Sequence, residues 1–400
     1  MSFIRFPEKF LFGASISNYQ HFGGLICDLP RIDSVKHAIY YEKDFEILKD
    51  LGLNAFRTGV DWARIEPEEG KIDQKAIKFY HDYLSKLKKT GVTTIIDLYH
   101  IGNPRWIYKY GGWASKEIVE KFLQYVELAI SEYDQYIDYY QVLNEPTVAA
   151  YFSSQYKSEE SLHTEEKESS RFISCLNNMN EAIRRSYDLI HEKNDEAMVG
   201  VSNPIVPFAT LSENKEESGE EQENFLEKVT EWTYKEIEAH KGKFDYIGIN
   251  YYGMYVADSH QFATMIVYPE GLREACKILT EKYNKPILIT ENGLPNRNDE
   301  EKTAFLVLHL KNLYDAITID DSNVIGYCWW SFLPGWERFY GTGWRPFFAL
   351  VDVDLVGDYE RRPTQTALEY KEIIRNRGFS MRLYERCLAK RNSIRYENWL

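Results

Sequence analysis

The stretch PILITENG, residues 286–293, is the strongest indicator of the fold. It is a nearly continuous apolar run that ends in the polar residues Thr290, Glu291 and Asn292. Strands that are covered by helices on both faces have this pattern, because neither face meets water. The stretch TTIIDLY, residues 93–99, has the same character. Both runs therefore predict buried strands of a parallel sheet.

Eight β-rich runs of this kind alternate with longer amphipathic segments along the chain. The segment EKDFEILKDLG, residues 42–52, places Phe45, Leu48 and Leu51 on one face and ends at a glycine, as helices often do. There are two further helical patterns: one ends at Gly91, and the other begins at Ser115. The predicted strands are Phe10–Ser17, Leu53–Val60, Thr93–Tyr99, Tyr139–Pro146, Met198–Pro204, Tyr246–Tyr252, Pro286–Gly293 and Val324–Ser331.

Eight strands, each followed by a helix, predict an α/β fold: a single closed (β/α)8 TIM barrel with short loop insertions. A doubly wound open sheet is the alternative, but no glycine-rich phosphate loop follows the first strand. No linker divides the chain, so residues 1–400 are expected to form one catalytic domain. The tail 377–400 is basic, with six Arg and Lys residues against two Glu. The sequence leaves open whether this tail docks on the acidic body or meets a neighbouring subunit in a homo-oligomer.

Composition restricts the class of protein. The chain is 44% apolar and 28% charged, as soluble globular proteins are, and it has no apolar run long enough to cross a membrane. A net charge of −14 argues against affinity for nucleic acid or for an anionic membrane surface. The start MSFIRFPEKF lacks the apolar region of a signal peptide, so a cytoplasmic protein is expected. The five cysteines are scattered without metal-binding spacing, which predicts reduced, buried thiols.

Polar and aromatic residues lie at or near the carboxyl ends of the predicted strands, where α/β barrels place their active sites. These residues are Arg57, Tyr99-His100, Asn144-Glu145-Pro146, Asn250-Tyr251-Tyr252, Thr290-Glu291-Asn292-Gly293 and Trp329-Trp330-Ser331. Two of them, Glu145 and Glu291, are carboxylic acids at the tips of strongly apolar strands. We expect both to lie in a partly desolvated mouth of the barrel.

A pair of rim carboxyl groups is what the cleavage of a glycosidic bond requires. One group must be protonated to donate to the leaving oxygen, and the other must be ionised to attack the sugar. Arg57 is a candidate cation beside Glu291, and Tyr251 is a candidate hydrogen-bond donor to the same carboxylate. Each motif alone also fits a structural role: a solvated turn acid for each glutamate, an ion pair at the barrel floor for Arg57, and a core imidazole for His100.

Seven segments, taken together, resemble the family 1 glycoside hydrolases, which are retaining β-glucosidases and β-galactosidases. They are FPEKFLFGASISNYQ (6–20), LGLNAFRTGVDWARIEP (51–67), DLYHIGNPRWIYKYGGW (97–113), VLNEP (142–146), INYY (249–252), ITENG (289–293) and IGYCWWSF (325–332). The segments run in the order of the family from about Phe6 to about residue 370. The resemblance implies a retaining β-glycosidase that uses neither a metal nor an organic cofactor.

The resemblance also implies residue roles. Glu145 matches the general acid/base, and Glu291 matches the nucleophile. Asn144 matches the residue that hydrogen-bonds the sugar 2-hydroxyl. Arg57 and Tyr251 match the partners that keep the nucleophile ionised and oriented.

Four further positions match contacts to the terminal sugar, or glycone. Gln20, His100 and Glu337 match polar contacts, and Trp330 matches the platform under the sugar ring. This agrees with the chemistry of a pyranose, whose hydroxyl edge needs paired donors and acceptors and whose C–H face stacks on an aromatic ring.

The chain departs from the family pattern at three places. Lys36-His37-Ala38-Ile39 stands where an Asp-His-Tyr-His-like run is usual, and Ile101 replaces the tryptophan that normally follows the strand-three histidine. Arg338 replaces a tryptophan after Glu337. A guanidinium near C4 or C6 of the sugar suits a carboxylate or phosphate, whereas pairing with Glu337 is the plainer interpretation. The departures leave sugar preference open.

The main hypothesis is therefore an exo-acting retaining β-glycosidase that hydrolyses terminal β-linked glucosyl or galactosyl residues of a small-molecule glycoside or oligosaccharide. A catalytically weakened sugar-binding barrel is one alternative. The others are a glycosidase for anionic glycones, either 6-phospho or uronic, and an endo-acting glucanase on a related barrel.

Overall fold

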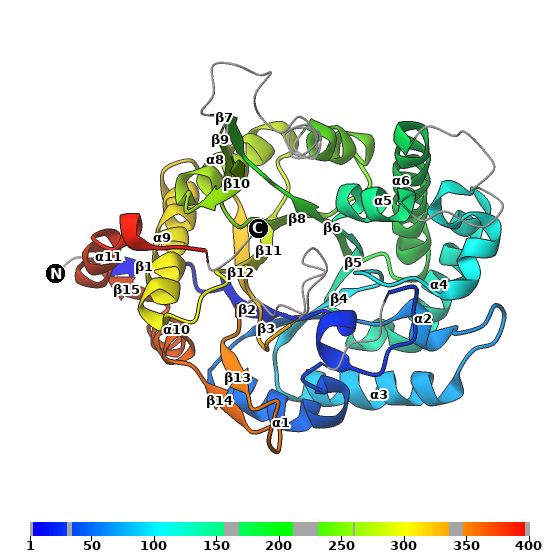
Figure 1. Cartoon of the computed structure of the whole chain (residues 1–400), viewed down its shortest axis with the longest axis horizontal. Helices are drawn as coiled ribbons and strands as arrows, with labels where there is room; N and C mark the ends of the chain where they lie inside the picture. Colours follow the sequence, from blue (N-terminus) through cyan, green and yellow to red (C-terminus); the bar gives the residue numbers. More distant parts are fainter. Residues whose placement is uncertain are drawn as a thin grey trace.

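Eight parallel strands close into a barrel at the centre of the molecule (Figure 1). The structure, a computed structural model, describes residues 3–29, 34–155, 168–210, 231–258, 261–335 and 347–396. In barrel order the strands are β2 (Leu11–Ser15), β3 (Ala55–Gly59), β4 (Thr93–Asp97), β5 (Tyr139–Asn144), β6 (Met198–Pro204), β8 (Tyr246–Asn250), β11 (Ile287–Asn292) and β12 (Val324–Trp330). Each predicted strand forms one of them, and the predicted (β/α)8 class is confirmed.

Helices surround the barrel (Figure 1). The longer ones are α1 (His37–Asp50), α3 (Gln74–Lys89), α4 (Glu117–Tyr133), α6 (Glu168–Lys193), α8 (Pro269–Tyr283), α9 (Asp299–Thr318) and α10 (Gln365–Asn376), and residues 231–239 are also helical. Two shorter helices, α2 (Trp62–Ile65) and α5 (Pro146–Ser154), directly follow β3 and β5. As predicted, Gly52 follows the end of α1. The backbone φ of Gly52 is +74°, a conformation that residues with a side chain rarely adopt.

Apolar side chains fill the inside of the barrel as well as the layer between barrel and helices. The interior cluster contains Ala55, Ile95, Tyr246, Leu288 and Cys328, all fully buried. On β3 the buried Ala55 precedes Arg57, and on β11 the buried Leu288 precedes Glu291. The barrel is therefore a packed support, and its polar residues gather at the carboxyl ends of the strands.

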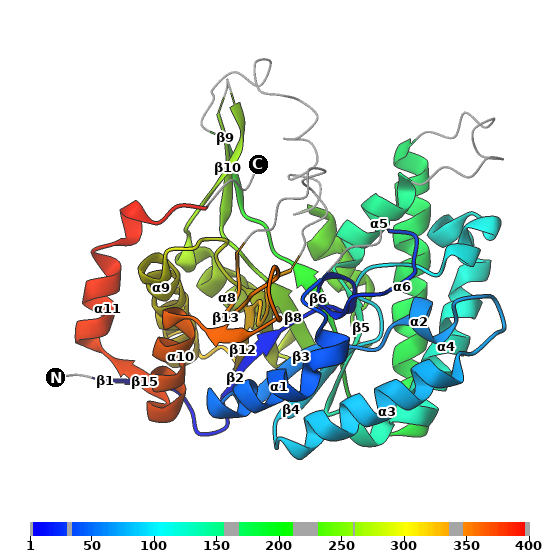
Figure 2. The ribbon, with the colours of Figure 1, turned by 60° about the horizontal axis from the view of Figure 1, so that its bottom comes forward.

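Small sheets decorate the barrel, in agreement with the short insertions that the sequence predicts. A three-stranded sheet of β7 (Phe208–Thr210), β9 (Met254–Asp258) and β10 (Gln261–Ile266) projects beyond the carboxyl ends of the strands (Figure 2). A second insertion, the antiparallel pair β13 (Val351–Val353) and β14 (Arg361–Pro363), lies between β12 and α10. Another antiparallel pair, β1 (Phe3–Arg5) and β15 (Gly378–Ser380), joins the segment before β2 to the segment after α10.

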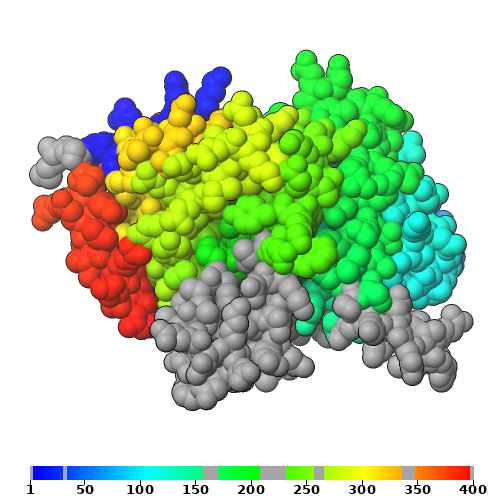
Figure 3. All heavy atoms as spheres, turned by 90° about the horizontal axis from the view of Figure 1, so that it is seen from above, coloured from blue at the N-terminus to red at the C-terminus, as the bar shows by residue number. Residues whose placement is uncertain are grey.

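The described part of the basic tail, residues 377–396, docks on the body of the protein. Helix α11 (Met381–Leu388) packs against α9 (Asp299–Thr318), and Figure 3 shows this red segment lying against the yellow part of the surface. Arg391 forms a two-bond ion pair with Glu270 of α8, at 2.5 and 2.7 Å. The described part of the tail therefore contacts the body of its own chain, and contact with a neighbouring subunit stays a prediction.

Two other expectations concern the described residues as a whole. All five cysteines are buried and free of disulfides, as predicted. None of the described helices is long and apolar enough to cross a membrane.

Candidate active site

Glu291 lies at the carboxyl end of β11 and is only 4% exposed. The guanidinium of Arg57, on β3, donates from Nη1 to Oε1 of Glu291. The hydroxyl of Tyr252 donates to the other oxygen, Oε2, at 2.6 Å. Each carboxylate oxygen thus has a donor, and the expected ion pair between Arg57 and Glu291 is present.

The hydroxyl of Tyr251 does not donate to the carboxylate of Glu291, contrary to the sequence-based expectation. Its buried hydroxyl donates to the backbone carbonyl of Tyr268, and its ring packs 6.0 Å from the ring of His309 on α9. Successive side chains of a strand point to opposite faces. Asn250 points into the barrel, so Tyr251 faces the helices and Tyr252 returns to the interior. Applied to the sequence from Asn250 onward, this alternation would have identified Tyr252 as the hydrogen-bond donor to Glu291.

Arg57 is fully buried and joins three acidic or amide groups. Its Nε and Nη2 atoms contact the two carboxylate oxygens of Asp97 at 3.1 and 2.9 Å. Nη2 also donates to Oδ1 of Asn144 at 2.7 Å. Asp97, which the sequence analysis did not single out, bonds Nδ1 of His100 at 2.9 Å as well. Arg57 therefore has a structural ion pair with Asp97 in addition to its bond with Glu291.

Glu145 stands between β5 and α5, with a backbone φ of 47°. This left-handed conformation is costly for a residue with a side chain and is often found at functional sites. The backbone N–H of Glu145 donates to the carbonyl of Ser202 at 2.8 Å. Its Oε1 accepts from Nδ2 of Asn250 at 2.9 Å, and the same nitrogen lies 3.0 Å from Oδ1 of Asn144. Asn250, on β8, thus ties this turn to the barrel.

The two glutamates have different electrostatic surroundings. Burial away from water raises the pKa of Glu145 to about 7, and the negative charge of Glu291 acts in the same direction. The hydrogen bond from Asn250 and the charge of Arg57 oppose this rise in the pKa of Glu145. Glu145 can therefore carry a proton near neutral pH. Glu291, in contrast, has a direct bond to the cation.

Three of the expected glycone residues lie at the same rim. Trp330, at the end of β12, is buried, and its ring is nearly parallel to the imidazole of His100, with centroids 5.7 Å apart and planes 11° apart. Gln20 is buried in the turn Asn18–Phe22 that follows β2, where the Ser17 hydroxyl donates to its side-chain oxygen. Glu337 and Arg338 lie outside the residues that the structure describes.

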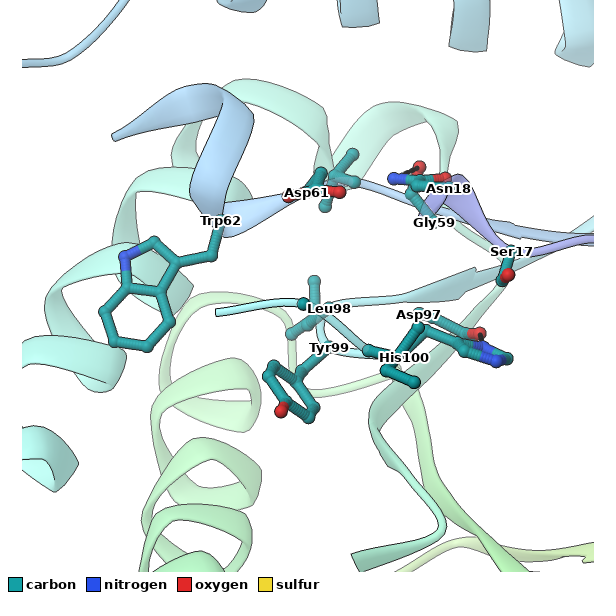
Figure 4. A pocket seen from close by; sticks show the side chains of 12 residues that line it. Ser17, Asn18, Gly59, Asp61, Trp62, Asp97, Leu98, Tyr99 and His100 are labelled. Atoms are coloured by element: carbon teal, nitrogen blue, oxygen red, sulfur yellow. Dashed lines mark hydrogen bonds and ion pairs between the residues drawn. The ribbon is translucent and has the colours of Figure 1, made fainter. Parts of the chain in front are cut away.

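Figure 4 shows a small cavity between the ends of β3 and β4, next to Asp97 and His100. Its volume is about 10 Å³, which suits one water molecule but not a sugar. Two of its residues have unusual polar groups. The Oδ1 atom of Asn18 has no hydrogen-bond partner among the residues that the structure describes, and burial raises the pKa of Asp61 to about 6. Ile101, which also lines it, packs on an apolar cluster with Tyr19, Leu25, Cys27, Leu29 and Ala63.

The described residues contain no group of three or more His, Cys, Asp or Glu side chains that could hold a metal ion. Two glutamates, with their hydrogen-bond partners, are the reactive groups described at this rim. These groups can transfer a proton at Glu145 and present an oriented carboxylate at Glu291.

Most of the chain is similar to one known protein family. Residues 33–247 and 256–379 match the profile of Glycosyl hydrolase family 1. The chain belongs to Glycosyl hydrolase family 1. The two matched segments leave out residues 248–255, which contain Asn250, Tyr251 and Tyr252. The contacts with Glu291, and not the family match, therefore distinguish the two tyrosines.

Three relatives illustrate the similarity of this family 1 member to known proteins, at 26 or 27% identity. It is 27% identical, over 84% of its length, to "Galactolipid galactosyltransferase SFR2, chloroplastic" of Arabidopsis thaliana, and it spans only 57% of that relative. It is 26% identical, over 95% of its length, to the whole of "Beta-glucosidase A" of Acetivibrio thermocellus. Its structure is similar to that of a beta-glycosidase from Pyrococcus horikoshii, with a TM-score of 0.81, 26% identity and coverage of 96% of this chain and 98% of that chain.

Proposed function

We propose that this family 1 member is an exo-acting retaining β-glycosidase that releases terminal β-linked glucosyl or galactosyl residues from small glycosides. One observation carries the proposal: two rim glutamates have opposite environments yet share a network. Glu145 has a raised pKa, and Glu291 is bonded to Arg57 and Tyr252. Asn144 bridges them, since its Oδ1 atom contacts both Arg57 and Asn250.

In the first step, the Glu145 carboxyl donates its proton to the glycosidic oxygen as the bond to the anomeric carbon breaks. The Glu291 carboxylate attacks that carbon and forms a glycosyl ester, while the aglycone leaves as an alcohol. Arg57 and Tyr252 hold the two oxygens of Glu291 and so restrict the direction of attack.

In the second step, Glu145 acts as a base. Burial still raises the pKa of Glu145 in this step, but the ester at Glu291 carries no charge, so the repulsion that adds to this rise is removed. The Glu145 carboxylate then takes a proton from water, the water oxygen attacks the anomeric carbon, and the ester bond breaks to regenerate both side chains. Two inversions retain the anomeric configuration, for which the carboxyl groups should lie about 5–5.5 Å apart.

The sugar-binding roles follow from the same network. The Oδ1 atom of Asn144 is occupied by Arg57 and Asn250, and its Nδ2 atom lies 3.4 Å from His100. The amide is thereby oriented, and its nitrogen can donate to the sugar 2-hydroxyl. Trp330, beside His100, provides an aromatic face for the C–H groups of the ring.

A second candidate function is glycosyl transfer, which the similarity to the galactolipid galactosyltransferase SFR2 favours. The first step would be the same, and a sugar hydroxyl would replace water in the second step. The two functions differ only in the acceptor, so one set of experiments can distinguish them.

The test is a panel of aryl β-glycosides that differ in the sugar: glucoside, galactoside, 6-phosphoglucoside and glucuronide. We expect turnover of the neutral sugars, with the β-anomer as the first product detected by NMR. Faster turnover of the 6-phospho or uronic substrates would replace the neutral-glycone assignment. Addition of a galactoside acceptor tests transfer, because a new disaccharide formed in preference to free sugar supports the second candidate. Absence of turnover on every substrate would leave only a sugar-binding role.

A further inference from the structure

We propose that Tyr396, in the C-terminal tail, is a positioning residue for the active site: it fixes Tyr252 and, through Tyr252, the carboxylate of Glu291. The inference rests on the proposed role of Glu291 as nucleophile. Tyr396 lies beyond residues 33–247 and 256–379, which match the family profile. It is therefore a feature of this chain outside the matched part of the family.

Two hydrogen bonds connect the tail to the nucleophile. The Tyr396 hydroxyl donates to the backbone carbonyl of Tyr252 at 2.5 Å. The Tyr252 hydroxyl donates to Oε2 of Glu291 at 2.6 Å. Tyr252 is thus held by its backbone at one end and bonded to the carboxylate at the other.

The chain makes room for this contact at Gly253. A Cβ atom at this position would lie 2.5 Å from the Tyr396 hydroxyl oxygen and 2.4 Å from the carbonyl oxygen of Ile266. Both distances are too short for a Cβ atom. Because glycine has no side chain, the Tyr396 hydroxyl can reach the backbone carbonyl of Tyr252. The close approach shows that the tail contacts the segment between β8 and β9 directly.

The residues before Tyr252 are fixed to β11 in another way. The N–H of Tyr251 donates to the carbonyl of Glu291 at 2.9 Å, and Nδ2 of Asn292 donates to the carbonyl of Tyr251 at 2.6 Å. These bonds align β8 with β11 up to Tyr251. The bond from Tyr396 fixes the backbone of the next residue, Tyr252, whose hydroxyl donates to Glu291.

The tail is itself anchored, which a positioning element requires. The N–H of Arg395 donates to Oε2 of Glu301 at 3.1 Å, and Nδ2 of Asn296 donates to the Arg395 carbonyl at 2.9 Å. Arg391 is paired with Glu270 on α8, five residues before Tyr396. These contacts attach both sides of the short stretch 391–396 to the barrel's helices and the loop before α9.

The ring of Tyr396 is also held. It packs edge-on against Phe305 of α9, with centroids 6.4 Å apart and planes 89° apart, and the nearby Ile394 is buried. The red trace in Figures 1 and 2 runs from α11 inward toward the barrel, consistent with these contacts. The Tyr396 hydroxyl is therefore held in a defined position beside Tyr252, as a positioning residue requires.

The test is a double-mutant cycle of Y396F and Y252F in the full chain, with an aryl β-glycoside as substrate. Y396F keeps the ring and removes only the hydroxyl. We expect kcat to fall roughly 3- to 10-fold, the effect of one hydrogen bond, with KM changed less than about twofold. In the Y252F background the same change should have little further effect on kcat, because Tyr396 acts through the Tyr252 hydroxyl.

Two further variants complete the test. Y384F removes another tail hydroxyl, from a ring that faces Lys311, and should leave kcat unchanged. R391A loosens the tail without altering Tyr396, and its loss of kcat should also disappear in the Y252F background; it serves as the test if Y396F does not fold. Wild-type kcat in Y396F, or an equal loss in both backgrounds, would overturn the inference.

The failure of the inference can be told from the failure of the proposed function by measuring E291Q in parallel. If E291Q is inactive and Y396F has wild-type kcat, only the positioning role is wrong. If E291Q keeps its turnover, the nucleophile assignment fails, and the role of Tyr396 fails with it.

Discussion

The hydroxyl of Tyr252 donates to Oε2 of Glu291, whereas the preceding Tyr251 donates to the backbone of Tyr268 on the other side of β8. Two adjacent tyrosines therefore have separate roles, one at the carboxylate and one in packing. The pair offers a matched comparison, since the same atom is removed from neighbouring positions.

Y252F should lower kcat roughly 10- to 100-fold, because a hydrogen bond to a charged group contributes about 1.5–3 kcal/mol. Y251F should change kcat less than about threefold and should lower the melting temperature, because it removes the hydrogen bond that the buried Tyr251 hydroxyl donates to the Tyr268 carbonyl. Steady-state kinetics and thermal unfolding of the two variants check this. A larger kinetic loss in Y251F than in Y252F would restore the original assignment.

The activity should fall on the alkaline side with an apparent pKa near 7. Burial and the charge of Glu291 raise the pKa of Glu145 to about 7, so the proton that the first step needs is present below this pH and lost above it. The measurement is kcat/KM against pH for a substrate with a poor leaving group. E145A, tested on a dinitrophenyl glycoside that needs little acid assistance, should lack the alkaline limb. Retention of the same limb in E145A would assign it to another group.

E291Q should lower the pKa of Glu145, because it removes the negative charge that contributes to the raised value. The change can be followed by ¹³C NMR titration of Glu145 in protein labelled at the glutamate carboxyl carbon, with E145Q used to assign the signal. A decrease relative to wild type supports the change from acid to base between the two steps. An unchanged or raised pKa would show that the charge of Glu291 does not control Glu145.

A second buried carboxyl group should affect stability. Glu236 is 1% exposed and accepts from the Thr147 hydroxyl at 2.5 Å; burial raises the pKa of Glu236 to about 8, and the bonds from Thr147 partly oppose this. The ordinary pKa of an unfolded glutamate is about 4.3. The folded state thus binds a proton that the unfolded state loses, so this stabilisation is present below pH 4 and is lost as the pH rises to about 8.

E236Q cannot ionise and should remove this pH dependence, which is at most about 1.4 kcal/mol per pH unit for one proton. Melting temperatures of wild type and E236Q between pH 5 and pH 8 provide the measurement. We expect the wild type to lose stability relative to E236Q as the pH rises. A constant difference across this range would mean that Glu236 does not change its protonation on unfolding.

The sequence predicted the strands well because each has a strong local signal. Runs such as 93–99 and 286–293 are apolar on both faces, and β4 and β11 form there. The meeting of Glu145, Arg57 and Glu291 was also predictable, because a parallel barrel brings the carboxyl ends of its strands to one rim. The exact bounds were less predictable: α4 begins at Glu117, two residues after the expected Ser115.

The contacts that the sequence did not reveal depend on partners far along the chain. Asp97 and Asn250 each resemble ordinary polar residues at a strand end, and their roles become visible only beside Arg57 and Glu145, which lie 40 and 105 residues away. Tyr396 is 144 residues from Tyr252, and no local pattern indicates where the tail docks. Such contacts are set by tertiary packing and not by local periodicity.

The assignment of Glu291 as nucleophile is tested most directly by trapping the glycosyl ester. The protein is treated with a 2-deoxy-2-fluoro-β-glucoside bearing a good leaving group, and the labelled peptide is identified by mass spectrometry. We expect inactivation with one sugar bound per chain, located on Glu291, and no labelling of E291Q. A label on Glu145 or on any other residue, or steady hydrolysis by E291Q, would contradict the assignment.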